Sequence, residues 1–159
     1  MVSLSDQFTT QDPSTTAEPV GRTTARPVGW TVWLLRIVVT VEAVLAFDQA
    51  IFAGRFIAGD YGAVATHAAN ATATGITLLV QAVAGVLLWR PGRGPWWPAV
   101  AALGIFGLVS IQITIGYSRV LAVHVPLGVS IIVLDVVMLV WAWRYRPAPP
   151  ATAGTGDER

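Results

Sequence analysis

The sequence contains no cysteine and no lysine, and only 12% of its 159 residues are charged. Without cysteine the chain can form no disulfide, no thiolate metal site and no thioether bond to a c-type haem. The net charge of +1 gives no reason to expect nucleic-acid binding. What the chain has instead is apolar surface, with 54% hydrophobic residues and a mean hydropathy of +0.62, outside the usual range of soluble proteins.

Four long apolar runs account for this composition, at about residues 30–53, 66–89, 96–117 and 121–143. About 20 apolar residues in a helix suffice to cross a bilayer core, so each run is long enough to span a membrane. The segments between them, at 54–65, 90–95 and 118–120, are short and contain glycine, proline or arginine. Gly104 and Gly107 are expected to let the third helix approach a neighbour closely. The sequence predicts an all-α fold, a transmembrane up-down-up-down four-helix bundle over residues 30–146.

Both ends of the chain differ from this apolar domain. Residues 1–29 and 147–159 are rich in small polar residues and proline, which predicts two disordered tails. The first apolar run is too long for the core of a cleaved signal peptide. Arg55 and Arg119 are the only arginines on one side of the predicted bundle, whereas six flank the other: Arg22, Arg26, Arg90, Arg93, Arg144 and Arg146. The positive-inside rule therefore predicts a multi-pass protein of the cell membrane with both termini in the cytoplasm.

Polar residues are also expected inside the membrane. At about 100° per residue, a polar stripe follows one face of the second run: His67, Asn70, Thr74, Thr77 and Gln81. A deeper layer is expected about 18–22 Å from the outer ends of the runs, formed by Glu42, Gln81 and Asp135. We favour hydrogen bonding between helices as the role of this layer, with a proton path as the alternative. Arg36 is expected to snorkel, or to reach back toward Glu42 or Asp135.

The only two histidines, His67 and His124, occupy matching positions at the outer starts of the second and fourth runs. Two imidazoles on opposite faces of one iron are the ligands of a low-spin haem, so the pair predicts such a site. The surrounding residues are assigned supporting roles: Gly128 leaves room for a flat ring, Arg55 and Arg119 suit the propionates, and Asp48, Asn70 or Gln112 bonds the far imidazole nitrogens. The alternative is two interfacial histidines hydrogen-bonded to loop carbonyls. Zinc is disfavoured because no third ligand is expected nearby.

One stretch of the chain resembles a known family. Gln112, Gly116-Tyr117, Arg119 and the run LAVHVPLG at 121–128 together resemble the junction between the third and fourth helices in one half of heme A synthase. The likeness covers about residues 30–145, and the chain is also similar to small actinobacterial-type integral membrane proteins that share the bundle. Each half of the enzyme carries a histidine pair near the outer face, so the resemblance implies that His67 and His124 are a haem-ligand pair.

The sequence departs from that family in two ways. It has one four-helix half rather than two, and Val64 stands where the family's catalytic half has a glutamate one turn before the first histidine. The resemblance therefore does not extend to oxidation of the haem methyl group, and we assign no catalytic residue.

Three functions remain open at this point. The first is binding of a b-type haem (haem b) near the outer face, for electron transfer, haem handling or redox sensing. The second is a structural or accessory membrane subunit without a cofactor. The third, a proton-coupled carrier, would need a duplicated, inverted architecture. The expected partners are the lipid bilayer and either a second copy of the chain or a larger respiratory or haem-related membrane complex.

Overall fold

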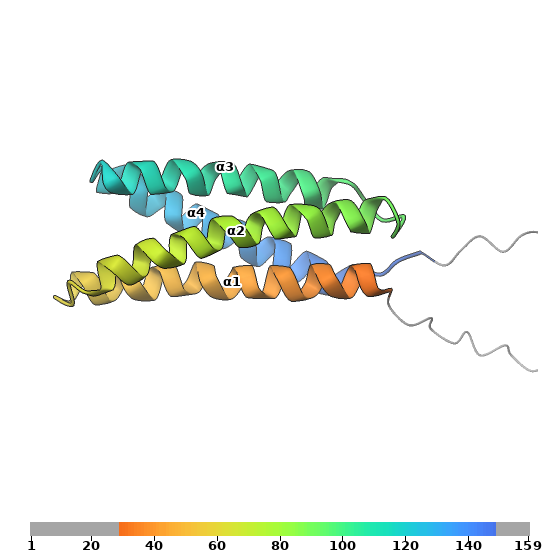
Figure 1. Cartoon of the computed structure of the whole chain (residues 1–159), viewed down its shortest axis with the longest axis horizontal. Coiled ribbons are helices and arrows are strands. Elements are labelled where there is room, and N and C mark those ends of the chain that lie inside the picture. The colour runs from red at the N-terminus through yellow and green to blue at the C-terminus, as the bar shows by residue number, and fades with distance from the viewer. Residues whose placement is uncertain (1–28, 149–159) are drawn as a thin grey trace, which may run out of the picture.

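The computed structural model describes residues 29–148, which form four α-helices joined by short connections (Figure 1). The helices are α1 (Trp30–Ile57), α2 (Ala63–Trp89), α3 (Trp97–Tyr117) and α4 (Leu121–Arg144), and the described part of the chain contains no strand. All four are long and apolar enough to cross a membrane. The predicted all-α four-helix bundle is confirmed, and the protein is a multi-pass membrane protein. Nearly all of the two predicted tails lies outside the described residues.

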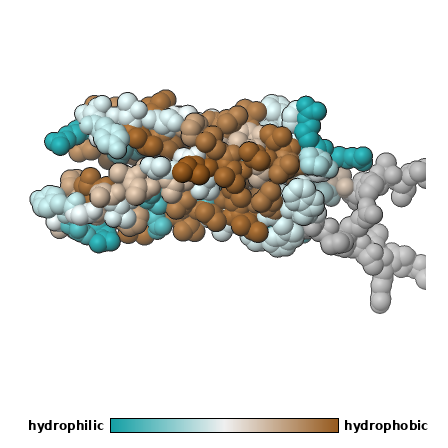
Figure 2. All heavy atoms as spheres, viewed as in Figure 1, coloured by the Kyte–Doolittle hydropathy of each residue, from teal (hydrophilic) through white to brown (hydrophobic). Residues whose placement is uncertain are grey.

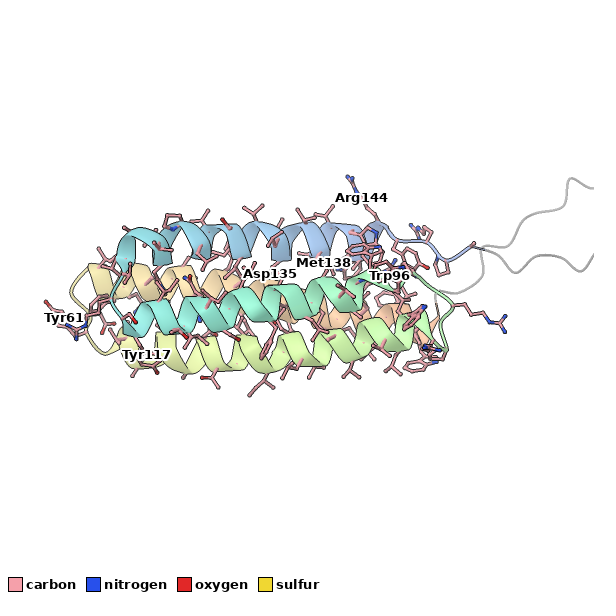
Figure 3. All side chains as sticks on the ribbon, turned by 90° about the horizontal axis from the view of Figure 1, so that it is seen from above. Tyr61, Trp96, Tyr117, Asp135, Met138 and Arg144 are labelled. Carbon is pink, nitrogen blue, oxygen red and sulfur yellow. The ribbon has the colours of Figure 1, made fainter. Side chains whose placement is uncertain are left out.

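The helices form a closed ring in chain order. α1 packs on α2, α2 on α3 and α3 on α4, while α4 completes the ring against α1. The pairs α1–α3 and α2–α4 are therefore diagonal. The start of α1 and the end of α4 lie at one end of the bundle, here named the terminal end, and the connections 58–62 and 118–120 lie at the other, named the loop end (Figure 1). Tyr61 and Tyr117 mark the loop end in Figure 3, and Trp96 and Arg144 mark the terminal end.

The first two helices are longer than the sequence predicted. The loop expected at 54–65 is wrong, because α1 continues through Gly54 to Ile57 and α2 begins at Ala63. A Cβ added at Gly54 would meet nothing within 4 Å, so this glycine stands on an open helix face rather than in a turn. The turn itself uses Gly59 at φ +100° and is closed by an ion pair of 2.6 Å between Arg55 and Asp60.

The packed core occupies only part of the bundle's length. One buried apolar cluster lies toward the terminal end and a second lies near the middle. Over the third of the bundle nearest the loop end, by contrast, no residue of segments 47–62, 64–73 and 110–130 is buried. In Figures 1 and 2 the hairpin α1–α2 separates here from the hairpin α3–α4, leaving an open mouth. The four helices are thus closed at the terminal end and splayed at the loop end.

A different glycine from those predicted lets the hairpins approach closely. A Cβ on Gly104 or Gly107 would meet nothing within 4 Å, so the expectation of close packing at these positions is wrong. A Cβ on Gly85 of α2 would lie 2.7 Å from the backbone nitrogen of Ala99 in α3. α2 and α3 therefore come together at Gly85, near the terminal end, which lies opposite to the mouth.

Aromatic side chains concentrate at the terminal end. All seven tryptophans lie at or beside helix ends there: Trp30, Trp33, Trp89, Trp96, Trp97, Trp141 and Trp143. Tryptophan favours the interface between water and the acyl chains, and Figure 2 shows the apolar surface between more polar ends. This belt marks one boundary of the membrane-embedded part.

Candidate functional site

The two histidines face each other across the mouth. His67 is in the second turn of α2 and His124 in the first turn of α4, and their ring centroids are 6.2 Å apart with the ring planes at 53°. These helices are diagonal in the ring, so the two side chains meet in the bundle interior rather than along a shared helix contact. Both side chains are half-buried. The predicted match in depth and facing agrees with this geometry.

His124 is fixed by a double contact with the neighbouring helix of its own hairpin. Its Nδ1 lies 3.0 Å from the backbone oxygen of Gln112, and the side-chain amide of Gln112 donates to the backbone oxygen of His124 at 2.8 Å. A carbonyl can only accept, so Nδ1 carries a proton and donates, and in the neutral imidazole Nε2 is then the nitrogen that can bind a ligand. Gly116 makes room for the ring, because a Cβ there would lie 2.9 Å from its Cε1.

His67 is held in the same way by α1. Its Nδ1 lies 3.1 Å from the backbone oxygen of Gln49. The side-chain amide of Gln49 can be oriented so that its oxygen and its nitrogen both meet suitable partners. Its oxygen then accepts from the Ala71 N–H at 2.7 Å, and its nitrogen lies 2.8 Å from the Nδ1 of His67. The carbonyl contact requires a protonated Nδ1 and the amide contact an unprotonated one. A metal ion on Nε2 would select the first arrangement.

The remaining predicted site residues take different positions around this pair. Asn70 donates to the backbone oxygen of Leu45 at 2.8 Å rather than to an imidazole. Gln112 does bond the far nitrogen of His124, but through its backbone. A Cβ on Gly128 would lie 2.9 Å from Gln112 Nε2, so Gly128 makes space for that amide and not for a flat ring as predicted. No side-chain hydrogen bond is found for Asp48, which is half-buried.

The two arginines at the loop end are both exposed. Arg55 pairs with Asp60, and Arg119 adopts a left-handed backbone conformation with φ 58° in the turn between α3 and α4. Both therefore stand at the rim of the mouth, on opposite hairpins.

A second polar group lies deeper in the bundle. Glu42, Gln81 and Asp135, on three different helices, are each at most 2% exposed, and Thr74 is 3% exposed. Figure 3 shows Asp135 on the inner side of α4. None of the carboxylate oxygens of Glu42 and Asp135, the amide atoms of Gln81 or the hydroxyl of Thr74 has a hydrogen-bond partner. The predicted common layer exists as a buried set, but the predicted hydrogen bonds between helices do not form.

Arg36 does not neutralise these carboxylates. Its guanidinium donates instead to the backbone oxygens of Ala142, Trp143 and Tyr145, at 3.0, 3.3 and 3.1 Å. The last carbonyls of a helix lack intrahelical partners and carry partial negative charge, so a buried arginine satisfies them well. The expectation that Arg36 reaches Glu42 or Asp135 is wrong, because the end of α4 offers it three oxygens.

The histidine pair fits the requirements of a six-coordinate haem iron. Two iron–nitrogen bonds of about 2.0 Å, added to the distance from each nitrogen to its ring centre, place facing imidazole centroids roughly 6 Å apart. The distance in this protein is 6.2 Å. The angle between the rings is no obstacle, since each ring can rotate about its own metal–nitrogen bond. Among the described residues no group of three or more His, Cys, Asp or Glu side chains could hold a metal ion.

Comparison with known proteins adds no relative: the chain matches no protein-family model, no curated protein and no solved structure. The fold and the site define the class by themselves. It is a multi-pass, all-α four-helix membrane protein with two tethered imidazoles facing each other across an open mouth.

Proposed function

We propose that this protein binds one b-type haem between His67 and His124 and uses it for electron transfer, haem handling or redox sensing. The observation that carries the proposal is the separation of 6.2 Å between two imidazoles on diagonal helices. Bound haem would supply a one-electron carrier at this point. The chain's own contribution is to fix both rings before the ligand arrives.

Three features of the mouth support this assignment. Each Nδ1 lies within hydrogen-bond distance of a backbone carbonyl, of Gln49 or Gln112, and a histidine that donates this bond offers Nε2 to a metal, which is the usual support of a metal-bound histidine. For His67 this is the arrangement in which the Gln49 amide does not donate to Nδ1. The hairpins part at this level, and no residue of 64–73 or 110–130 is buried, so a planar group can enter without displacing a packed core. Arg55 and Arg119 stand at the rim, where guanidinium groups suit carboxylates such as propionates.

We also propose an orientation in the cell membrane. The arginines flanking the terminal end outnumber those flanking the loop end, which by the positive-inside rule puts both termini in the cytoplasm. The mouth with its histidines then opens toward the outer face, so an electron partner would dock there. Accessibility of a cysteine introduced at Tyr61 to a membrane-impermeant thiol reagent in intact cells tests this orientation. A lack of labelling in intact cells, together with labelling after lysis, would reverse it.

The haem proposal is tested by absorption spectroscopy of the purified protein supplied with haem, oxidised and then reduced with dithionite. We expect a bis-histidine spectrum for the native chain, and its loss in both His67→Ala and His124→Ala. Thr72→Ala is the matched control, because Thr72 is exposed on α2 and bonds only the backbone oxygen of Ala68. No bound haem in the native chain, or an unchanged spectrum in both histidine variants, would sink the proposal.

The second candidate is a structural or accessory subunit without a cofactor. It is favoured by the same two carbonyl contacts, since a neutral histidine bonded through Nδ1 is also a satisfied interior residue. The two candidates separate on one measurement. A structural pair predicts that His67→Ala and His124→Ala lower stability equally with and without added haem, whereas a ligand pair predicts that haem stabilises only the native chain.

A further inference from the structure

The deeper polar group poses a problem that the histidine pair does not solve. Glu42 on α1 and Asp135 on α4 are 1% and 2% exposed, and their four carboxylate oxygens have no hydrogen-bond donor. They stand on helices that pack against each other. A buried charge without a partner is strongly unfavourable, and two of the same sign are worse.

No positive group of the described chain offsets these charges. Arg36, the only buried cation, is taken up by the carbonyls at the end of α4. The histidines stand at the mouth, and α3 contains no charged residue. Asp48, the other acidic residue of α1, adds only negative charge. The neutralising charge must therefore come from outside the described side chains.

Two uncharged side chains complete the group. Thr74 and Gln81 lie two turns apart on the buried face of α2, the helix that packs against α1, and their hydroxyl and amide atoms are also unpartnered. A buried amide or hydroxyl without a partner is itself costly. Together the four residues supply oxygens that can accept hydrogen bonds and an amide that can donate one, which is the environment that a protonated carboxyl requires.

The surroundings of this group differ on its two sides. Toward the mouth, the stripe on α2 continues as Asn70 and His67, so polar groups lead outward. Toward the terminal end lies an apolar cluster, and the buried charged side chain beside it, Arg36, is bound to the carbonyls at the end of α4. The cluster consists of Val32, Leu35, Val39, Ala84, Leu88 and Ala142. Water and protons follow polar groups and avoid such a cluster. Access is therefore one-sided.

We propose that Glu42 and Asp135, with Gln81 and Thr74, form a proton-binding site that is filled from the mouth and closed toward the terminal end. One proton bound by the two carboxyls leaves the pair with one negative charge instead of two. Because the apolar cluster lies between the site and the terminal end, the bundle holds this proton and does not conduct it across the membrane.

Infrared spectroscopy of the full chain in lipid nanodiscs tests the proposal directly. Solvated carboxyls are ionised at neutral pH, so a protonated-carboxyl stretch in the native protein must come from buried groups. We expect this band at neutral pH, its loss in Glu42→Gln or Asp135→Asn, and its retention in Asp48→Asn. A native protein without the band, or a band kept in both variants, overturns the proposal. A band that disappears on adding sodium ions alone also overturns it, because the site would then hold a metal cation.

Access is tested on the same band by mixing with heavy water. We expect Asn70→Leu to slow its hydrogen–deuterium exchange several-fold, whereas Thr72→Leu, on the outer face of the same helix, leaves the rate unchanged. Vesicles containing the protein should leak protons no faster than protein-free vesicles. Equal exchange in the two variants, or a protein-dependent leak, contradicts one-sided access. Haem binding by Asp135→Asn is measured as well. If this variant still binds haem, the result on the carboxyl band is independent of the histidine pair.

Discussion

Gln112 and His124 bind each other twice, through the imidazole Nδ1 on the backbone oxygen of Gln112 at 3.0 Å and through the Gln112 amide on the backbone oxygen of His124 at 2.8 Å. The first contact sets the tautomer of the ring and the second locks the start of α4 to the end of α3. One glutamine therefore fixes both the chemistry and the position of one candidate ligand.

Gly116→Ala should disturb this arrangement. The new Cβ would lie 2.9 Å from Cε1 and 3.2 Å from Nδ1 of His124, so the ring must turn away from Gln112. We expect weaker haem binding and a loss of about 1–3 kcal/mol in stability, as for other overpacked sites. Gly104→Ala, in the same helix with nothing within 4 Å, should leave haem binding unchanged. Haem titration of both variants checks the prediction, and equal affinities would contradict it.

Replacing either of two interior glutamines by leucine should lower stability. Gln81 is 1% exposed and belongs to the proposed proton site, where its amide can bond a protonated carboxyl, so Gln81→Leu should destabilise the bundle by about 1 kcal/mol. Gln112→Leu removes the donor to the backbone oxygen of His124 and should destabilise the bundle by about 1 kcal/mol. Unfolding in mixed detergent measures both. A gain of stability in Gln81→Leu would show that no protonated carboxyl uses this amide.

The contact at Gly85 should not tolerate a methyl group. A Cβ there would lie 2.7 Å from the backbone nitrogen of Ala99, and backbone cannot move aside as a side-chain tip can. We expect Gly85→Ala to destabilise the protein by about 1–3 kcal/mol. Gly107→Ala should be neutral or slightly stabilising, since its Cβ has open space and alanine favours helix. Thermal unfolding of the two variants in detergent checks this prediction. Equal unfolding midpoints for Gly85→Ala and Gly107→Ala would show that α2 and α3 are less tightly packed than described.

Loss of the Arg36 guanidinium should be costly. Arg36→Gln removes three hydrogen bonds to the last carbonyls of α4, and we expect a loss of about 2–3 kcal/mol. Arg55→Gln breaks an exposed ion pair with Asp60 and should cost under about 1 kcal/mol. Hydrogen exchange at the end of α4, measured by mass spectrometry, should rise in the first variant only. Unchanged protection there would mean that the tryptophans beside Arg36 hold this end without it.

The sequence predicted the parts of this fold that depend on hydrophobic length and period. Four apolar runs gave four helices, and the polar stripe on the second run faces the interior because lipid cannot satisfy it. The prediction of a loop at 54–65 was wrong because Gly54 and Gly62 suggest a turn. In a bilayer, however, backbone N–H and C=O groups left without partners are unfavourable, so a helix extends further and bonds them internally. Only residues 58–62 remain outside helix.

The positions of the two histidines were predictable from the sequence, whereas the groups that hold them were not. Two histidines at matching depth are visible in the sequence, but Gln49 acts through its backbone oxygen, and any residue type carries one. The role of Gly116 was equally hidden, because it depends on where the His124 ring lies across the helix interface. For Arg36 the sequence predicted either snorkelling or contact with a carboxylate, because the unpaired carbonyls at the end of α4 leave no mark on residue type.

Each imidazole is hydrogen-bonded within its own hairpin, His67 to α1 and His124 to α3, whereas the hairpins pack against each other toward the terminal end, through Arg36 and the contact at Gly85. The distance between the rings therefore depends on the angle between the two hairpins. A ligand bound by both histidines would fix that angle. Its release would let the hairpins separate at the loop end without breaking a hydrogen bond within either hairpin.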